Sequence, residues 1–382
     1  MNPVFTEVTE AQYNRYVKEW KEQGKPVAGY TCSFVPEEVF HAAGILPFRI
    51  RGFSARETTI GDTYFGPFIC SLPKCMLQCA GQGDLRFLDG TVIVPGCDSM
   101  RRLDECWRKA GVDIEGILPE FFFHFSVPHK HTDYTVRWFA EEIQRLIAAV
   151  ENHFGVHIGE EDLRKSIKVY NRTRELVTEF EMLRTRDDPA CTGAEALSVL
   201  LAGTAMPREE YNALLEEYIA EAGNAPGISG KTRLLLGGSA CDDIDLVTLV
   251  EGAGALVVAD NVCFGSRFFE DRTGEDGDPI EELALRYLGQ NLCPRMYGDY
   301  DRRLSLLLER AAKAKVQGVI LQNIRFCDLH GSENGLLERE FESRGIPCMR
   351  IEREYGPLVE TGRLKMRIDA FQERIQQGKV RV

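Results

Sequence analysis

Six cysteines in this chain occupy positions that favour thiolate chemistry over packing. They lie after short apolar runs or in loops: Cys32 after "VAGY", Cys70 after "YFGPFI", Cys97 after "TVIV", Cys263 after "ALVVADN", Cys293 in "GQNLCPRM" and Cys327 after "GVILQNIRF". In open α/β sheets, ligands gather beyond the carboxyl ends of the strands. Thiols presented there suit a metal site, whereas structural thiols fall on the apolar faces of helices and strands.

The spacing of these thiols indicates which metal chemistry they favour. Zinc sites usually contain tight local pairs such as C-x-x-C, and none occurs among the twelve cysteines. The run "CSLPKCMLQC" holds Cys70, Cys75 and Cys79, so a local zinc or cluster site is an alternative there. Cys75 and Cys79 share one helical face, however, which favours helix packing. An iron–sulfur cluster fits the six thiols better, because its ligands can come from distant parts of a chain.

The remaining cysteines are given no metal role. We expect Cys106 in "LDECW" and Cys348 in "IPCMRI" to be buried as small hydrophobic side chains. Cys191 and Cys241 lie near loops, and the sequence assigns a function to neither of them. In a reducing compartment, none of these thiols is expected to form a disulfide.

The elements that must position the six thiols follow an α/β pattern. Short apolar runs alternate with helical segments, which implies parallel sheets with helices on both faces. We predict two doubly wound, Rossmann-like lobes joined by a helical connector, with the metal cluster in the cleft between the lobes. The predicted boundaries are 1–131 for the N-terminal α/β lobe, 132–227 for the helical connector and 228–382 for the C-terminal α/β lobe.

Composition narrows the classes of partner. Hydrophobic residues make up 44% and charged residues 27% of the 382-residue chain, as in ordinary globular proteins. The net charge of -13 argues against nucleic-acid binding, because phosphate backbones attract cationic surfaces. No apolar run is long enough to span a bilayer, and "MNPVFTEVTEAQYNRYVKEW" lacks the core of a signal peptide. We therefore expect a cytoplasmic protein without a nucleic-acid or membrane partner.

Six stretches of the chain, taken together, are specific to one family: "GYTCSFVPEEVFHAAGILPFRI", "FICSLPKC", "LDGTVIVPGCDSMRRLDECW", "EGAGALVVADNVCFGSRFF", "GVILQNIRFCD" and "IPCMRIEREYGPLVETGRLKMRIDAFQE". Through them the sequence resembles the D component of the 2-hydroxyacyl-CoA dehydratase and benzoyl-CoA reductase family. The resemblance implies that Cys70, Cys97 and Cys327 bind a 4Fe–4S cluster. Asp98 and Asp328 are explained as helix N-caps rather than as ligands.

The other three thiols, Cys32, Cys263 and Cys293, resemble cysteines of one branch, the double-cubane cluster proteins. That resemblance implies an Fe8S9 cofactor, two cubanes joined by a bridging sulfide, in each subunit of a homodimer. It also implies a partner, a separate ATPase with its own 4Fe–4S cluster that drives a low-potential electron into this chain. The chain has no P-loop G-x-x-x-x-G-K-[ST], so we expect the ATP chemistry on that partner.

Three functions follow. The first is an anaerobic iron–sulfur reductase that takes electrons from the ATP-hydrolysing partner and reduces a small substrate at the double cubane. The second is a 2-hydroxyacyl-CoA dehydratase subunit with one 4Fe–4S cluster, where a transient electron makes a ketyl radical of a CoA thioester and water leaves. The third is a non-catalytic iron–sulfur electron carrier. Iron content separates the first two functions, and catalytic turnover excludes the third.

Candidate proton donors are few among the seven histidines. His330, three residues after Cys327, is the predicted catalytic residue, because a proton source beside a reducing cluster is useful. The stretch "FFFHFSVPHKHTD" either lines a pocket or forms a solvated turn, and it contains His124, His129 and His131.

Other polar residues have simpler explanations. His41 is expected in packing or at the surface. Arg101 and Arg102 are expected on an exposed helix face, with contact to phosphate or to the partner ATPase as the alternative. Glu37 and Glu38 follow a proline at a predicted helix start, where acidic side chains stabilise the helix.

Overall fold

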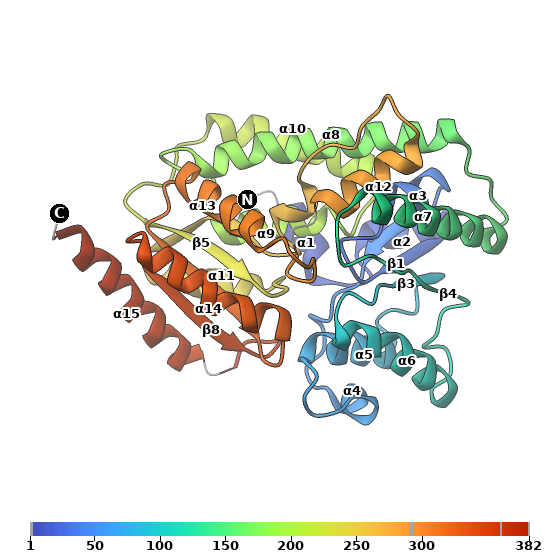
Figure 1. Ribbon diagram of the computed structural model, residues 1–382, viewed down its shortest axis with the longest axis horizontal. Helices are drawn as coiled ribbons and strands as arrows, with labels where there is room; N and C mark the ends of the chain where they lie inside the picture. Colours follow the sequence, from blue (N-terminus) through green and yellow to red (C-terminus); the bar gives the residue numbers. More distant parts are fainter. Residues whose placement is uncertain (1–2, 291–292, 360, 381–382) are drawn as a thin grey trace.

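Two parallel sheets form the framework of the chain (Figure 1). The computed structural model describes residues 3–290, 293–359 and 361–380. The N-terminal sheet has the strand order β2-β1-β3-β4, and the C-terminal sheet has the order β6-β5-β7-β8. Neighbouring strands in both sheets pair in parallel, so helices connect the successive strands. The predicted α/β class with two parallel sheets is confirmed.

The N-terminal sheet consists of four short strands. They are β1 (Val27–Tyr30), β2 (Leu46–Arg49), β3 (Gly90–Ile93) and β4 (Phe121–His124). The first three are buried along their whole length, as expected for parallel strands covered on both faces. Gly90 allows β3 and β4 to approach closely, because a Cβ at Gly90 would lie 2.8 Å from the ring of Phe121. β4 is an edge strand in a stretch where the sequence indicated a pocket lining or a turn.

Six helices are described in the N-terminal part of the chain, from residue 3 to residue 113. They are α1 (Pro3–Glu10), α2 (Arg15–Glu22), α3 (Glu37–Ala42), α4 (Thr59–Tyr64), α5 (Ser71–Gln82) and α6 (Asp98–Asp113). The start of α2 shows local sequence control, since the Asn14 side chain accepts hydrogen bonds from the N–H groups of Tyr16 and Val17. The end of α5 is set by Gly83, whose φ of 91° is left-handed.

The middle of the chain is helical, as predicted. It contains α7 (Asp133–Phe154), α8 (Glu160–Thr185), α9 (Gly193–Ala202) and α10 (Arg208–Asn224). α7 begins at a capping box formed by Thr132 and Thr135 and ends at Gly155 in the left-handed conformation. α8 and α10 lie side by side along the top of the molecule in Figure 1. The boundaries at residues 131 and 227 stay predictions.

The C-terminal sheet has longer strands. They are β5 (Thr232–Gly238), β6 (Ala255–Asn261), β7 (Gly318–Ile324) and β8 (Cys348–Arg353). The helices of this part are α11 (Ile244–Gly252), the 3-10 helix η1 (Ser266–Phe269), α12 (Pro279–Gln290), α13 (Tyr300–Lys313), α14 (Asp328–Ser343) and α15 (Thr361–Val380). α12 leaves its own sheet and packs against α7 and α8, which ties the two halves together.

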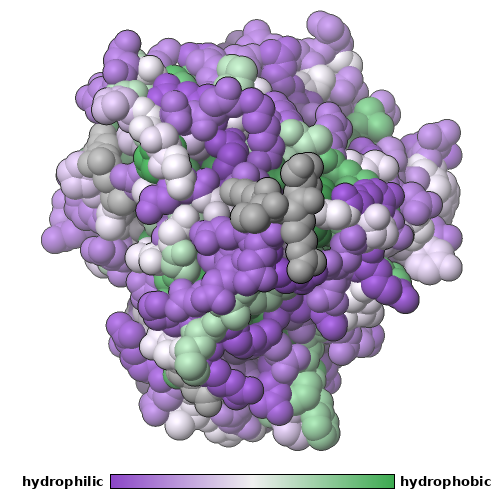
Figure 2. Space-filling view, turned by 90° about the vertical axis from the view of Figure 1, so that its left-hand side faces the viewer, coloured by the Kyte–Doolittle hydropathy of each residue, from purple (hydrophilic) through white to green (hydrophobic). Residues whose placement is uncertain are grey.

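One hydrophobic core extends through both halves, and a second, smaller cluster lies against the C-terminal sheet. The larger core includes Val27 and Val92 of the first sheet together with Leu234 and Ile320 of the second. The surface seen in Figure 2 is mostly hydrophilic, with scattered apolar patches. Within the described ranges, no helix has both the length and the apolar character needed to cross a membrane.

Candidate functional site

Four of the six candidate thiols follow strands, at the carboxyl ends where parallel sheets collect ligands. The strand order reverses between β1 and β3 in one sheet and between β5 and β7 in the other, and such switch points are the usual ligand sites of doubly wound folds. Three of these strands lead to candidate thiols: β1 to Cys32, β3 to Cys97 and β7 to Cys327. The other candidates are Cys263 after β6, Cys70 before α5 and Cys293 after α12.

Burial separates the candidate thiols from the other cysteines. Five candidates remain partly exposed, namely Cys32, Cys97, Cys263, Cys293 and Cys327, and only Cys70 is buried. The six cysteines without a predicted metal role are all buried. The expected burial of Cys106 and Cys348 is thereby confirmed, at 4% and 3% exposure. Cys75 and Cys79 are likewise buried within α5, in keeping with their packing role.

Three candidates, the helix-cap cysteines, are Cys70, Cys97 and Cys327. Each is the N-cap residue directly before a helix, α5, α6 or α14 respectively. The prediction that Asp98 and Asp328 are the N-caps is therefore wrong by one residue, and both aspartates lie in the first helical turn instead. A helix N-terminus presents free N–H groups and a partial positive charge, which stabilise an anion placed there.

Backbone N–H groups reach these thiols, although none of the three forms a standard side-chain capping bond. Burial raises the pKa of Cys70 to about 11, while the hydroxyl of Ser99 and the N–H of Leu72 oppose that rise. Burial likewise raises the pKa of Cys97 and of Cys327. In the metal-free chain these thiols are therefore protonated at neutral pH, and metal binding must release their protons.

The helix-cap cysteines lie close enough to interact with one another. The negative charge of Cys327 adds to the raised pKa of Cys70, and both Cys70 and Cys327 raise the pKa of Cys97. Cys70 and Cys97 belong to the N-terminal half of the fold, whereas Cys327 follows a strand of the C-terminal sheet. The fold thus brings thiols of both halves into one region.

The remaining candidates, the loop cysteines, are Cys32, Cys263 and Cys293. Buried arginines support the backbone around two of them. Arg49 Nη1 donates to the carbonyl of Cys263 at 2.5 Å, and Arg303 Nη1 donates to the carbonyl of Cys293 at 3.4 Å. Burial and the neighbouring Cys293 raise the pKa of Cys32, while the positive charge of Arg49 acts in the opposite direction.

Cys293 connects the two groups of thiols. It interacts electrostatically with Cys32 of the loop cysteines and with Cys97 and Cys327 of the helix-cap cysteines. Cys263 is connected to this region through Arg49, which holds its carbonyl and also acts on Cys32.

The donor set suits a polynuclear group better than a single ion. In the described part of the chain, no three His, Cys, Asp or Glu side chains are arranged to hold one metal ion. A tetrahedral zinc ion would draw its ligand sulfurs to within about 4 Å of one another. The cysteines of a cubane each bind a different iron, so soft thiols gathered in one region at wider spacing fit an iron–sulfur cluster.

His330 lies in the first turn of α14, and its backbone N–H points to the thiol of Cys327. Loss of solvent around the ring and the positive charges of Arg267 and Arg303 lower the pKa of His330 to about 3. Its imidazole is therefore neutral at physiological pH in the metal-free chain, so the ring must take up a proton before it can act as a general acid. The catalytic role of His330 stays a prediction.

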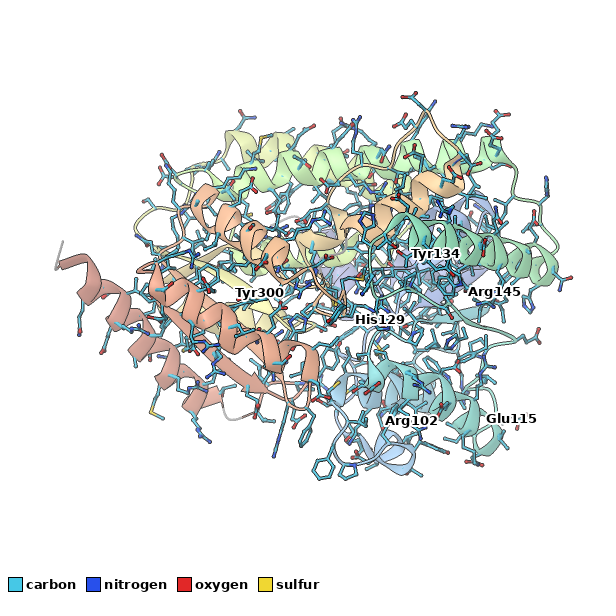
Figure 3. The ribbon with its side chains drawn as sticks, viewed as in Figure 1. Arg102, Glu115, His129, Tyr134, Arg145 and Tyr300 are labelled. Carbon is cyan, nitrogen blue, oxygen red and sulfur yellow. The ribbon has the colours of Figure 1, made fainter. Side chains whose placement is uncertain are left out.

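The other histidines are mostly structural. His41 contacts Ser166 at 2.9 Å and Glu209 at 3.0 Å, in agreement with packing near the surface. His129 lies near the middle of the molecule in Figure 3, where it contacts Arg295. His124 is partly exposed on β4, 3.7 Å from Asp104.

The sequence predicted the helix position of Glu37 and Glu38 but not their burial. Glu37 and Glu38 were expected to serve a helix start, and both lie in the first turn of α3. They are also fully buried and paired, Glu37 with Arg208 at 2.6 Å and Glu38 with Arg174 at 2.5 Å. By contrast, Arg102 lies on an exposed helix face, as expected, and pairs with its helix neighbour Glu105 (Figure 3).

A cavity of about 410 Å³ lies beside the site, between the two halves. Its lining includes Arg51 after β2, Asp242 after β5 and Tyr355 after β8. The Tyr355 hydroxyl donates to Asp242 at 2.7 Å, and the Tyr355 backbone N–H donates to Ser71 Oγ, next to Cys70. Both sheets therefore contribute the ends of their strands to a shared polar space.

Comparisons with known proteins identify the family of the chain. Residues 32–375 match the protein family described as 2-hydroxyglutaryl-CoA dehydratase, D-component. A subunit of the benzoyl-CoA reductase of Thauera aromatica is 28% identical over 88% of both chains. The (R)-phenyllactyl-CoA dehydratase beta subunit of Clostridium sporogenes is 26% identical over 91% of both chains. The beta subunit of (R)-2-hydroxyglutaryl-CoA dehydratase from Acidaminococcus fermentans is 24% identical over 87% of this chain and 88% of its own.

Proposed function

The chain belongs to the family of 2-hydroxyglutaryl-CoA dehydratase D-components, and from this premise we propose that it is an iron–sulfur reductase. It accepts low-potential electrons from a separate ATP-hydrolysing activator protein and reduces a small substrate at a double-cubane Fe8S9 cluster. The helix-cap cysteines hold one cubane, and the loop cysteines hold the other. We further propose that two copies of the chain form a homodimer.

The observation that carries this proposal is that five thiols from both halves of the fold, Cys32, Cys70, Cys97, Cys293 and Cys327, act on one another electrostatically. The sixth, Cys263, is connected to Cys32 through Arg49. Five of the six keep partial exposure, and Cys293 interacts with members of both groups. Single-cubane chemistry needs only one such group. A single 4Fe–4S cluster at the helix-cap cysteines would leave the second group, Cys32, Cys263 and Cys293, without a metal role.

A bound iron–sulfur cluster supplies one-electron transfer at a potential set by charge, hydrogen bonding and solvent access. The residues of the chain provide the surroundings. Helix N-termini at Cys70, Cys97 and Cys327 stabilise thiolates, and the surrounding burial limits water. His330 has a neutral imidazole beside Cys327 in the metal-free chain, so in the proposed role it would take up a proton at the site before passing one to substrate.

The second candidate function is a 2-hydroxyacyl-CoA dehydratase subunit. It is favoured by the names of two relatives, which are dehydratase beta subunits. In that case the chain binds one 4Fe–4S cluster at the helix-cap cysteines alone. An electron carrier without catalysis is the third candidate, and it is excluded if reduced substrate accumulates over many turnovers.

Removal of single loop thiols tests the proposed function. Anaerobically purified chains with Cys32→Ser or Cys263→Ser should each lose a large part of their iron and sulfide, because each removes a ligand of the second cubane. The matched control is Cys348→Ala, which alters a buried cysteine of β8 and should leave the iron content unchanged. Unchanged iron in either serine variant would show that the double-cubane assignment is wrong.

A further inference from the structure

Arg295 is a buried cation within the candidate site. Its side chain is 4% exposed, and it lies two residues after Cys293. Its guanidinium stacks on the ring of Phe34, with 4.8 Å between the guanidinium carbon and the ring centroid. Phe34 itself lies two residues after Cys32, so this contact connects two cysteine loops.

The hydrogen bonds of Arg295 reach two further loops. Arg295 Nε donates to the carbonyl of Gly96 at 3.0 Å. Arg295 Nη1 donates to Pro128 O and Nη2 to Val127 O, each at 2.9 Å, and Nη2 also approaches His129 Nε2 at 3.3 Å. The guanidinium fork therefore connects the loop after β3, the loop after β4 and the loop that carries Cys293.

Gly96 lies at the centre of this arrangement. It directly precedes Cys97, and a Cβ built on it would lie 3.7 Å from Cys32 Sγ. By holding the Gly96 carbonyl, Arg295 fixes the backbone between a helix-cap cysteine and a loop cysteine. The position of Arg295 thus affects both groups of thiols.

Arg295 differs from several other buried arginines in its counter-charge. In the described residues no carboxylate forms an ion pair with it, and the groups that act on it electrostatically are Cys32, Cys293 and Cys97. Several buried arginines have acidic partners: Arg174 with Glu38, Arg208 with Glu37 and Arg303 with Glu333. A buried cation without a partner is costly. The thiolates that form at these three cysteines when a metal cluster binds would supply the missing partner.

We propose that Arg295 is a positioning residue that clamps the loops bearing Cys32, Cys97 and Cys293 and balances the negative charge of the bound cluster. This inference rests on the proposed function, since it requires thiolates at the site. The two roles depend on different properties of the side chain. Clamping requires the wide planar fork that reaches several carbonyls, whereas charge balance requires only a positive charge.

Two substitutions separate the roles. Arg295→Lys keeps the charge but cannot reach the carbonyls of Gly96, Val127 and Pro128 together. Arg295→Met removes both the charge and the clamp. A nearby positive charge favours the more negative, reduced form of a cluster, so its loss should shift the midpoint potential to more negative values. Loss of the clamp should speed iron release by roughly 10- to 100-fold, the range for residues that orient metal ligands.

Arg233 offers a matched control. It lies near the amino end of β5, away from the carboxyl ends that carry the thiols. It also donates to several carbonyls, those of Thr185, Arg186 and Ala314. Its Lys and Met variants therefore remove a similar carbonyl clamp and a similar charge at a distance from the site.

The experiment measures the midpoint potential by redox titration followed by electron paramagnetic resonance, and the rate of iron release to a chelator. Arg295→Met should show a more negative potential and faster iron release, and Arg295→Lys should show faster release at the wild-type potential. Both Arg233 variants should match the wild type. Wild-type values in Arg295→Met would overturn the inference; if that variant does not fold, wild-type iron release in Arg295→Lys would overturn it. A wild-type chain without iron would instead overturn the proposed function.

Discussion

The helix-cap cysteines and the loop cysteines reach the same region by different physical means. Each helix-cap thiol directly precedes a helix, whose free N–H groups favour a thiolate. The loop thiols lack such a helix, and buried arginines hold the surrounding backbone instead. Arg49 holds the Cys263 carbonyl, Arg303 holds the Cys293 carbonyl, and Arg295 holds the turn beside Cys32.

The helix-cap thiols are supported by residues close in the sequence, whereas the loop thiols are supported by residues far away in the sequence. A helix start is determined by a few neighbouring residues, so a helix-cap thiol carries its stabilisation with it. The arginine that supports Cys263 lies 214 residues away in the sequence. The loop-cysteine site should therefore be the more sensitive of the two to substitutions elsewhere in the fold.

The largest predicted effect comes from a substitution that removes the support of a loop cysteine. Glu333→Ala removes the buried partner of Arg303, whose Nε lies 3.0 Å from both Glu333 oxygens. Breaking a buried ion pair leaves an uncompensated charge, so we expect the free energy of unfolding to fall by about 3–5 kcal/mol. Arg303 also donates to the Cys293 carbonyl, so iron release should become faster. Chemical denaturation and chelator kinetics measure the two effects.

A surface pair on the same helix provides the comparison. Glu340→Ala breaks the exposed pair with Arg344 and should lower the free energy of unfolding by less than about 1 kcal/mol. Equal losses in the Glu333 and Glu340 variants would contradict the role given to buried arginine support.

The next prediction concerns a helix-cap thiol in the metal-free chain. Folding raises the pKa of Cys70 to about 11, whereas an unfolded thiol titrates near about 8.5. Between these two pKa values, Cys70 keeps its proton in the folded chain but loses it in the unfolded chain. The free energy of unfolding contributed by this difference is therefore fully present below about pH 8.5, and it is lost as pH rises from about 8.5 towards 11. Over this pH range, the free energy of unfolding should fall less steeply with pH in Cys70→Ser than in the wild type, by about 1.4 kcal/mol per pH unit.

Urea denaturation at a series of pH values measures this slope. The other buried thiols contribute to the slope in both proteins, so the difference between wild type and Cys70→Ser isolates the Cys70 contribution. Identical slopes would mean that the Cys70 thiol titrates alike in the folded and unfolded chain.

The smallest predicted effect concerns the hydrogen bond from Ser99 to a helix-cap cysteine. The Ser99 hydroxyl lowers the pKa of Cys70 by hydrogen bonding to its sulfur. A hydrogen bond of about 0.5–1.5 kcal/mol corresponds to at most about one pKa unit, so Ser99→Ala should raise the pKa of Cys70 by up to that amount. The pH dependence of thiol alkylation measures the shift. Ser343→Ala, at the far end of α14, should leave it unchanged.

Much of the fold follows from periodicity in the sequence. Alternating apolar runs and helical patterns predicted the parallel α/β sheets and the helical middle of the chain. The edge strand β4 was not recognised, although Phe favours strands, because "FFFH" is only four residues long and shows no alternation of apolar and polar residues. The N-cap assignment missed by one residue, since Asp is a common cap and Cys is not.

Sequence reasoning predicted the cysteines of the candidate site but not the arginines that support them. Cysteines after strands are visible because the apolar run before each of them marks the strand. The supporting arginines leave no such signal: Arg295 meets Gly96 across 199 residues, and Glu38 meets Arg174 across 136. Such contacts depend on how the two halves pack together, which local patterns do not encode.

The measurement that tests the central claim most directly is the iron and acid-labile sulfide content of the anaerobically purified wild-type chain. Two groups of thiols each holding a cubane predict about eight irons and about nine sulfides per chain. About four irons and four sulfides would contradict the double-cubane assignment and favour the dehydratase subunit.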